Sequence, residues 1–180
     1  MLFNTFVYRL RGEASLSLLI RRGLKIGKNL KIMHGTIIDD SHPWLIEIGD
    51  NVTLAPRVHI LAHDASTKNY LGYTKIGRVV IGDNVFIGAD SVILPGVAIG
   101  NNVIIGANST VTHSIPEGMV VVGCPAHVIC STEDYLNKER KRMKSAPLYD
   151  ESYTLRGNIS EDKKQKQRQE LANGIKGYVD

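Results

Sequence analysis

The sequence is poor in cysteine and contains no long apolar run. Two cysteines among 180 residues are too few for a disulfide framework or a zinc cluster of their own. No segment approaches the roughly 20 uninterrupted apolar residues of a membrane-spanning helix. The N-terminal segment carries Arg9, Arg11 and Glu13 in its middle and lacks the small-residue cleavage site of a signal peptide. These absences predict a cytoplasmic protein without structural disulfides.

Aromatic residues are also sparse, and charge of one sign is concentrated at one end. The chain has one Trp, three Phe and seven Tyr, and none alternates with basic residues as a base-stacking surface requires, so we expect no nucleic-acid partner. The net charge is only +4, but residues 1–31 hold one acid, Glu13, and seven basic residues: Arg9, Arg11, Arg21, Arg22, Lys25, Lys28 and Lys31. This segment fits an exposed helix face or a peripheral contact with an anionic membrane.

The sequence does contain a repeat with a period of six. Aliphatic side chains recur in phase at Ile81, Ile87, Ile93, Ile99, Ile105 and Val111, and four of the six are followed by glycine. An earlier block follows the same rule at Ile26, Ile32, Ile38, Ile48, Leu54 and Ile60. The wider gap between Ile38 and Ile48 inside this earlier block indicates a short insertion, around residues 41–44.

A period of six excludes an ordinary helix, whose period is 3.6, and a simple strand, whose period is 2. It suits a three-sided parallel β-solenoid in which each hexad supplies one short strand and one corner. The aliphatic residue then points inward, while Gly, Asn or Asp serves the corner. We therefore predict an all-β solenoid with three hexads per coil and coils stacked about 4.8 Å apart.

Segments outside the repeat divide the chain into three predicted parts. Residues 1–25 form a helical cap, because apolar residues over 2–24 have helical spacing. Residues 26–130 form the solenoid, interrupted by a loop over 61–75, with the repeat resuming near Ile76. Residues 131–180 form a helical extension, with a helix over 133–144 and a polar tail over 157–180 that is either helical or disordered.

Three strings of the sequence resemble the hexapeptide-repeat acyltransferases. They are IEIGDNVTLAP at 46–56, VVIGDNVFIGADSVILPGVAIGNNVIIGANSTVT at 79–112 and VVGCPAHVI at 121–129. They are most similar to the branch of galactoside, maltose and polysaccharide O-acetyltransferases. The resemblance implies a left-handed parallel β-helix, a homotrimer, and acetyl-CoA bound in a groove between neighbouring solenoids.

The resemblance also implies a catalytic histidine at the start of the protruding loop, which is His63 in this sequence. A sugar hydroxyl attacks a thioester only when a base takes its proton, and imidazole titrates in the right range for this work. Adjacency alone does not decide whether Asp64 orients the ring. His59, in the same string HILAH, is the rival candidate and is interpreted as part of the scaffold.

The resemblance implies acetyl-CoA contacts in the late hexads. The matching positions are Ala89, Ala107, Thr112, His113, His127 and Cys130. The two alanines would leave room for the pantetheine arm, whereas His113 and His127 stand where the family usually has Lys or Arg for the phosphates. Because neutral histidine is a weak phosphate ligand, basic residues over 138–141 are an alternative source of this contact.

For the acceptor, Asp40 matches an acidic residue that binds sugar hydroxyls in this branch. A structural role for Asp40 at a solenoid corner is equally compatible with the sequence. Trp44, inside the insertion, is compatible with stacking on a sugar ring or with packing against the N-terminal helix.

These patterns predict an O-acetyltransferase that moves acetyl directly from acetyl-CoA to a carbohydrate hydroxyl, without a covalent intermediate or a metal. Within the same chemistry, serine or the amine of a nucleotide sugar is an alternative acceptor. A zinc carbonic anhydrase of the same solenoid class would need three histidines converging on one metal. A non-catalytic trimeric scaffold would need neither the loop histidine nor a groove lined by small residues.

Overall fold

The computed structural model describes residues 15–180. The chain divides into two compact units, Met1–Thr132 and Glu133–Asp180. Most of the predicted N-terminal helix and its basic residues Arg9 and Arg11 lie outside the described residues, so the membrane contact stays a prediction. The described part begins with α2 (Leu16–Arg21), whose Leu19 is 3% exposed and belongs to the apolar core of the first unit.

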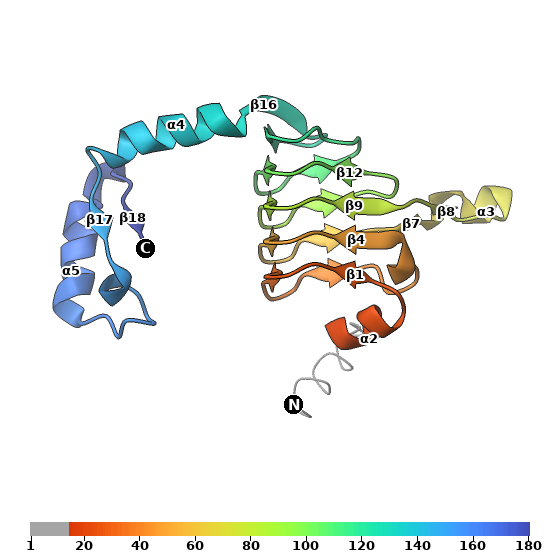
Figure 1. Cartoon of the computed structure of the whole chain (residues 1–180), viewed down its shortest axis with the longest axis horizontal. Helices are drawn as coiled ribbons and strands as arrows, with labels where there is room; N and C mark the ends of the chain where they lie inside the picture. The colour runs from red at the N-terminus through yellow and green to blue at the C-terminus, as the bar shows by residue number, and fades with distance from the viewer. Residues whose placement is uncertain (1–14) are drawn as a thin grey trace. The chain divides into compact units, whose positions relative to one another are not determined.

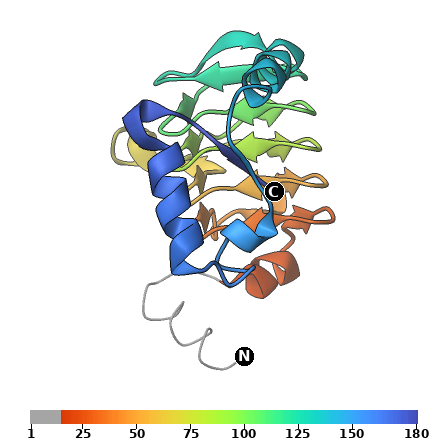
Figure 2. The same ribbon diagram turned by 90° about the vertical axis from the view of Figure 1, so that its left-hand side faces the viewer.

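The first unit contains three parallel sheets, and successive short strands along the chain join these sheets one after another (Figures 1 and 2). The first sheet contains β1 (Lys25–Ile26), β4 (Ile46–Ile48), β9 (Val79–Ile81) and β12 (Ala98–Ile99). The second contains β2 (Lys31–Ile32), β5 (Thr53–Leu54), β10 (Phe86–Ile87), β13 (Ile104–Ile105), β15 (Met119–Val122) and the antiparallel β16 (His127–Ser131). The third contains β3 (Ile37–Ile38), β6 (His59–Ile60), β11 (Val92–Ile93) and β14 (Thr110–Val111). Since consecutive strands up to β6 and from β9 to β14 enter different sheets, each coil contributes one strand to each side.

The strand register confirms three hexads per coil. Phe86 pairs with Ile104, which is three hexads further along the chain. Lys31 pairs with Thr53, and the extra length of this coil falls at the predicted insertion, where the chain forms η1 (Pro43–Leu45). Thr53 pairs with Phe86 across a wider separation in sequence, because a longer segment leaves the coil between them.

The aliphatic residue of each hexad points inward, as the repeat predicts. Ile81, Ile87, Ile93, Ile99, Ile105 and Val111 are all at most 2% exposed. They stack from coil to coil with other buried aliphatic residues such as Leu54 and Ile60, both fully buried. Burying a side chain of this size stabilises the fold by about 1.5–3 kcal/mol, so the core depends on stacking of coils rather than on any single hexad.

Asparagine occupies one corner of successive coils in the left-handed backbone conformation. Four such residues have a φ of 56°: Asn29, Asn51, Asn84 and Asn102. Their side-chain amides form a ladder, with N···O distances of 2.9, 3.1 and 3.2 Å from one coil to the next. Asparagine tolerates this conformation better than most residues, which explains why Asn stands three residues after the aliphatic position at this corner.

The segment over 61–75 is a structured arm rather than an irregular loop (Figure 1). It contains β7 (His63–Asp64), η2 (Ala65–Thr67), α3 (Lys68–Leu71) and β8 (Lys75–Ile76), and β7 pairs with β8 antiparallel. The repeat resumes three residues after Ile76, the position near which the sequence predicts it. Ile76 is 58% exposed in the returning strand of the arm, opposite His63, and the coil resumes with β9 at Val79.

The second unit continues from the coil through a helix. The predicted helix over 133–144 is confirmed as α4 (Thr132–Met143), and part of the polar tail forms α5 (Glu161–Glu170). Between and after them lie β17 (Leu148–Tyr149), η3 (Glu151–Tyr153), η4 (Ala172–Gly174) and β18 (Tyr178–Val179). Within residues 15–180, no helix has the length and apolar character needed to cross a membrane.

Candidate functional site

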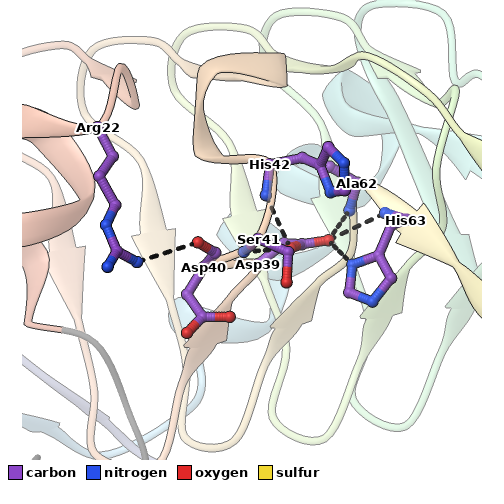
Figure 3. Close-up of polar contacts among 7 residues, drawn as sticks. All are labelled: Arg22, Asp39, Asp40, Ser41, His42, Ala62 and His63. Atoms are coloured by element: carbon purple, nitrogen blue, oxygen red, sulfur yellow. Dashed lines mark hydrogen bonds and ion pairs between the residues drawn. The ribbon is translucent and has the colours of Figure 1, made fainter.

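Two segments that leave the third sheet meet beside the base of the arm (Figure 3). Asp39 directly follows β3, and its backbone N–H donates to the carbonyl of Ile60 in the next coil (2.9 Å). His63 begins β7 just after β6. Parallel stacking of β3 on β6 therefore brings residues from two successive coils to one place.

The Asp39 carboxylate is buried and receives hydrogen bonds on both oxygens. Oδ2 accepts from the backbone N–H groups of Ala62 (2.8 Å) and His63 (2.9 Å). Oδ1 accepts from those of Ser41 (2.9 Å) and His42 (3.2 Å). Burial by itself raises the pKa of Asp39, but the hydrogen bonds from His63, Ala62 and Ser41 outweigh it and bring the pKa below its ordinary value. The carboxylate is therefore ionised at neutral pH.

The imidazole of His63 is oriented by this carboxylate. Its Nδ1 lies 2.5 Å from Oδ2 of Asp39, and its side chain is 35% exposed. Since an ionised carboxylate only accepts hydrogen bonds, Nδ1 donates to it, and in the neutral ring Nε2 then keeps its lone pair. A ring held in this tautomer can take a proton at Nε2, and the buried charge of Asp39 stabilises the imidazolium that forms.

Asp64 has a different role from that of Asp39. Its carboxylate accepts from the backbone N–H of Ser66 (2.8 Å), capping η2, and forms an ion pair with Lys75 across the arm (2.5 Å). Lys75 and Ser66 together lower the pKa of Asp64 to about 2. Asp64 therefore stabilises the arm, and the residue that orients His63 is Asp39.

His42 lies beside this pair. Its ring centroid is 5.7 Å from that of His63 and 5.2 Å from that of Trp44. Its Nδ1 is the buried side-chain polar atom without a hydrogen-bond partner within residues 15–180. Ligand atoms of Asp39, His42 and His63 lie within 4.8 Å of one another, and this is the group of possible metal ligands in the described chain. A zinc site of the carbonic anhydrase kind would use His59 together with His63, but His59 does not belong to this group.

The predicted acceptor residues flank the pair. The exposed carboxylate of Asp40 is turned away from His63 (Figure 3), while its backbone carbonyl accepts from Arg22 (3.3 Å). Trp44 is 55% exposed within η1. A Cβ placed on Gly23 would lie 2.8 Å from Cβ and 3.3 Å from Cα of Trp44, so these two atoms of Trp44 lie close to the backbone of Gly23.

The predicted acetyl-CoA residues fall into separate groups. Ala89 and Ala107 follow β10 and β13 on the same corner of successive coils, where the backbone N–H of Asn108 donates to the carbonyl of Ala89 (2.7 Å). Thr112 and His113 follow β14 on the corner that also contains His63, two coils further, which is about 10 Å along the axis. Their side chains form a hydrogen bond of 2.8 Å.

The two remaining residues lie on the antiparallel strand β16. His127 is exposed and pairs with Val122, and Cys130 pairs with Val120. The structure therefore brings together Ala89 with Ala107 and Thr112 with His113, and it places His127 and Cys130 on a different element.

Asp39 and His42 are neighbours of His63 that the hexad pattern does not predict. The signal that finds them is the strand register between the first two coils, in which Ile38 pairs with Ile60. This register places Asp39 beside Leu61, at the start of the segment that leads into the arm.

Comparison with known proteins agrees with the repeat. A family model described as bacterial transferase hexapeptide (six repeats) matches residues 78–113. Protein CapG of Staphylococcus aureus is 44% identical over 127 residues, which cover 68% of this chain and 69% of CapG. The chain belongs to the hexapeptide-repeat transferase family.

Two solved acetyltransferase structures are similar to this chain over about three fifths of its length. A maltose O-acetyltransferase from Clostridium difficile 630 is 43% identical with a TM-score of 0.55, over 61% of this chain and 59% of that protein. The hexapeptide-repeat acetyltransferase VCA0836 from Vibrio cholerae, solved with acetyl coenzyme A, is 31% identical with a TM-score of 0.56. That match covers 62% of this chain and 61% of the other. The chain thus spans less than two thirds of these solved relatives.

Proposed function

We propose that this protein is an acetyl-CoA-dependent O-acetyltransferase acting on a carbohydrate hydroxyl, with His63 as general base and Asp39 as the residue that orients it. The observation that carries this proposal is the bond between Nδ1 of His63 and the buried, ionised carboxylate of Asp39. A buried carboxylate bonded by four backbone N–H groups serves to fix one tautomer of a partly exposed imidazole. Similarity to an O-acetyltransferase and to an acetyltransferase solved with acetyl coenzyme A supports the choice of reaction.

The proposed reaction is a direct transfer. Nε2 of His63 takes the proton of the acceptor hydroxyl while its oxygen attacks the thioester carbonyl. When the tetrahedral intermediate collapses, the carbon–sulfur bond breaks and the CoA thiolate takes the proton back from the imidazolium. Asp39 stays ionised throughout and stabilises the positive charge on the ring between these steps. Cys124 and Cys130 have no part in this scheme.

For acetyl-CoA, we infer binding along the corners that follow the second and third sheets. Ala89 and Ala107 present methyl groups on successive coils, where a pantetheine arm requires small side chains. The hydrogen-bonded pair of Thr112 and His113 lies on the corner that contains His63, with His127 and Cys130 as further predicted contacts. We extend the inference to a left-handed coil and a homotrimer, as the family resemblance implies.

For the acceptor, we infer a sugar held near the first coils by Asp40 and Trp44. Asp40 is exposed and directly follows Asp39 in the chain, and Trp44 is 55% exposed one residue beyond Pro43. An exposed carboxylate suits sugar hydroxyls, and an exposed indole suits the apolar face of a sugar ring. Serine or the amine of a nucleotide sugar is the alternative acceptor within the same chemistry.

The deciding experiment measures acetyl transfer and cofactor binding in the same variants. We expect His63→Ala to lose about 10²–10⁴-fold in transfer rate from acetyl-CoA to a panel of sugars, serine and amino sugars. Calorimetric titration should show unchanged acetyl-CoA affinity in His63→Ala and weaker affinity in His113→Ala and His127→Ala. Transfer that survives His63→Ala would exclude the proposed base.

The same experiment separates the alternatives. A scaffold without enzymatic activity would bind no acetyl-CoA at millimolar concentration and would transfer no acetyl group to any acceptor in the panel. Acetyl-CoA affinity that is unchanged in both His113→Ala and His127→Ala would be compatible with the proposed enzyme but would exclude these two residues as phosphate ligands.

A further inference from the structure

Three potential metal ligands converge where the first coil meets the arm. Ligand atoms of Asp39, His42 and His63 lie within 4.8 Å of one another, and the two imidazole rings are 5.7 Å apart (Figure 3). All three come from different structural positions: the residue after β3, the insertion before η1, and the first residue of β7. The proposed transfer reaction uses His63 and Asp39 but gives His42 no role.

His42 is the unexplained member of this group. Its Nδ1 is buried and lacks a hydrogen-bond partner within the described chain. A buried polar atom left without a partner is destabilising, and a nearby ligand can offset this cost. The backbone N–H of the same residue donates to Oδ1 of Asp39 (3.2 Å), so His42 is tied to the carboxylate beside which its ring lies.

From this arrangement we infer that Asp39, His42 and His63 form a binding site for a divalent transition-metal ion. The bound ion masks His63, in the sense that it occupies Nδ1 and leaves the proton on Nε2. Two imidazoles and one carboxylate are a common ligand set of zinc, with a solvent molecule as the fourth ligand. Imidazole nitrogen favours Zn²⁺, Ni²⁺ and Cu²⁺, whereas Mg²⁺ and Ca²⁺ prefer oxygen ligands. Backbone N–H groups donate to both oxygens of Asp39 and hold this carboxylate in place, as hydrogen bonds to the ligating groups do in metal sites.

Binding of an ion between Asp39 and His63 requires a movement of His63. Its Nδ1 is 2.5 Å from Oδ2 of Asp39, and the proton between them stands where the ion would bind. Zinc bonds of about 2.0–2.2 Å to both atoms require them to separate by roughly 1 Å. The 35% exposure of the His63 side chain leaves room for this displacement.

Metal binding changes the tautomer of His63. When Nδ1 bonds to the ion, the proton of the neutral ring resides on Nε2, so the number of protons on the ring is unchanged. Nε2 then has no lone pair with which to accept a proton. If His63 is the base proposed above, the ion switches off acetyl transfer, and this consequence rests on that proposed function. Binding and masking do not depend on it.

The test uses the full chain freed of metal with a chelator and titrated with Zn²⁺ by calorimetry and with Co²⁺ by visible absorption. We expect one ion per chain, an absorption spectrum of four-coordinate Co²⁺, and at least tenfold weaker binding in His42→Ala and in His63→Ala. The matched controls are His59→Ala and His34→Ala, which remove histidines outside the group and should bind as the unchanged protein does. Circular dichroism of each variant checks that it folds.

A chemical readout tests masking without any enzymatic assay. Diethyl pyrocarbonate should modify His63 more slowly in the presence of Zn²⁺, and His42→Ala should abolish this protection, as measured by mass spectrometry of the His63 peptide. Failure to bind Zn²⁺ at about 1 mM, where even weak sites fill, or binding that survives both histidine changes, overturns the site. Binding without protection of His63 overturns the masking. Absence of acetyl transfer from the metal-free protein would instead refute the proposed function and leave the metal result as measured.

Discussion

The Asp39 carboxylate accepts hydrogen bonds from four backbone N–H groups and from the imidazole N–H of His63. All five donors point at this one carboxylate. The neighbouring Asp40 has the same side chain but is exposed and turned away from His63. At the residue scale, the function of this site therefore depends on which of two adjacent aspartates faces the arm. Asp39 is the buried one, and its carboxylate accepts from the backbone N–H groups of Ala62 and His63 at the base of the arm.

Asp39→Asn tests this dependence. An asparagine amide presents a donor to two backbone N–H groups in either orientation, so we expect a loss of about 2–4 kcal/mol in the free energy of unfolding. The matched control is Asp40→Asn, for which we expect a change within about 0.5 kcal/mol. Urea denaturation of the two variants measures both, and equal effects would contradict the assignment of Asp39.

The pH dependence of stability gives a second test at Asp39. The pKa of this carboxyl is lower in the folded protein than in the unfolded chain, where it is about 3.9. Its ionised form therefore stabilises the fold fully above about pH 4 and progressively less as the pH falls through the folded pKa. We expect the stability difference between the unchanged protein and Asp39→Asn not to fall between about pH 7 and about pH 4.5 and to shrink only below about pH 4. A difference that is already lost near pH 6 would exclude this cause.

At the scale of an element, the corner after β10 is packed too closely for any side chain larger than hydrogen. A Cβ on Gly88 would lie 2.4 Å from the backbone nitrogen of Ala107, in the next coil. Gly96 differs: its Cβ would meet nothing within 4 Å, but its φ of +86° is unfavourable for a residue with a side chain. Glycine is therefore required at position 88 because the next coil is close, and at position 96 because of the backbone conformation.

Gly88→Ala and Gly96→Ala form a matched pair. We expect Gly88→Ala to cost roughly 3 kcal/mol, because the backbone of the next coil has to move, and Gly96→Ala to cost about 1–2 kcal/mol. Thermal and urea unfolding measure the two values. If Gly88→Ala were the milder change, the stacking distance at this corner would be wrong, and with it the placement of Ala89 on Ala107.

At the scale of the whole molecule, the buried apolar core belongs to the first unit. All its fully buried members lie between Leu19 and Val121, and none lies in the second unit, Glu133–Asp180. The second unit has its own contacts, such as the hydrogen bond from the hydroxyl of Tyr149 to Glu170 (2.9 Å). Trp44, the one tryptophan of the sequence, reports on the first unit alone.

Ile93→Ala and Tyr149→Phe should therefore affect different unfolding transitions. Ile93 is fully buried, so its truncation should lower the stability of the coil by about 2–5 kcal/mol, seen as an earlier change in Trp44 fluorescence. Tyr149→Phe removes one hydrogen bond of the second unit, worth about 1 kcal/mol, and should leave the fluorescence transition where it is. A common shift of that transition in both variants would mean that the two units unfold together.

The coil and the loop histidine could be predicted from the sequence, whereas the neighbours of His63 could not. The hexads of Ile81 to Val111 specify inward side chains locally, and the position of the insertion follows from the wider gap between Ile38 and Ile48 in the earlier block. The arm was harder to predict. Ile76 has the residue type of a hexad but belongs to β8, because antiparallel pairing with His63 outweighs the local pattern.

The three-sided coil, its turn of three hexads and its aliphatic core follow from local sequence, because each hexad carries its own corner and its own buried residue. The contents of the site depend on contacts between residues that are far apart in the sequence. Asp39 meets His63 only through the register of β3 on β6, and the insertion lies within the stretch of chain that this register spans. The same insertion carries the ring of His42 to within 5.7 Å of that of His63. A periodic sequence states which residues point inward, but the distance between side chains at a corner depends on how insertions shift one coil over the next.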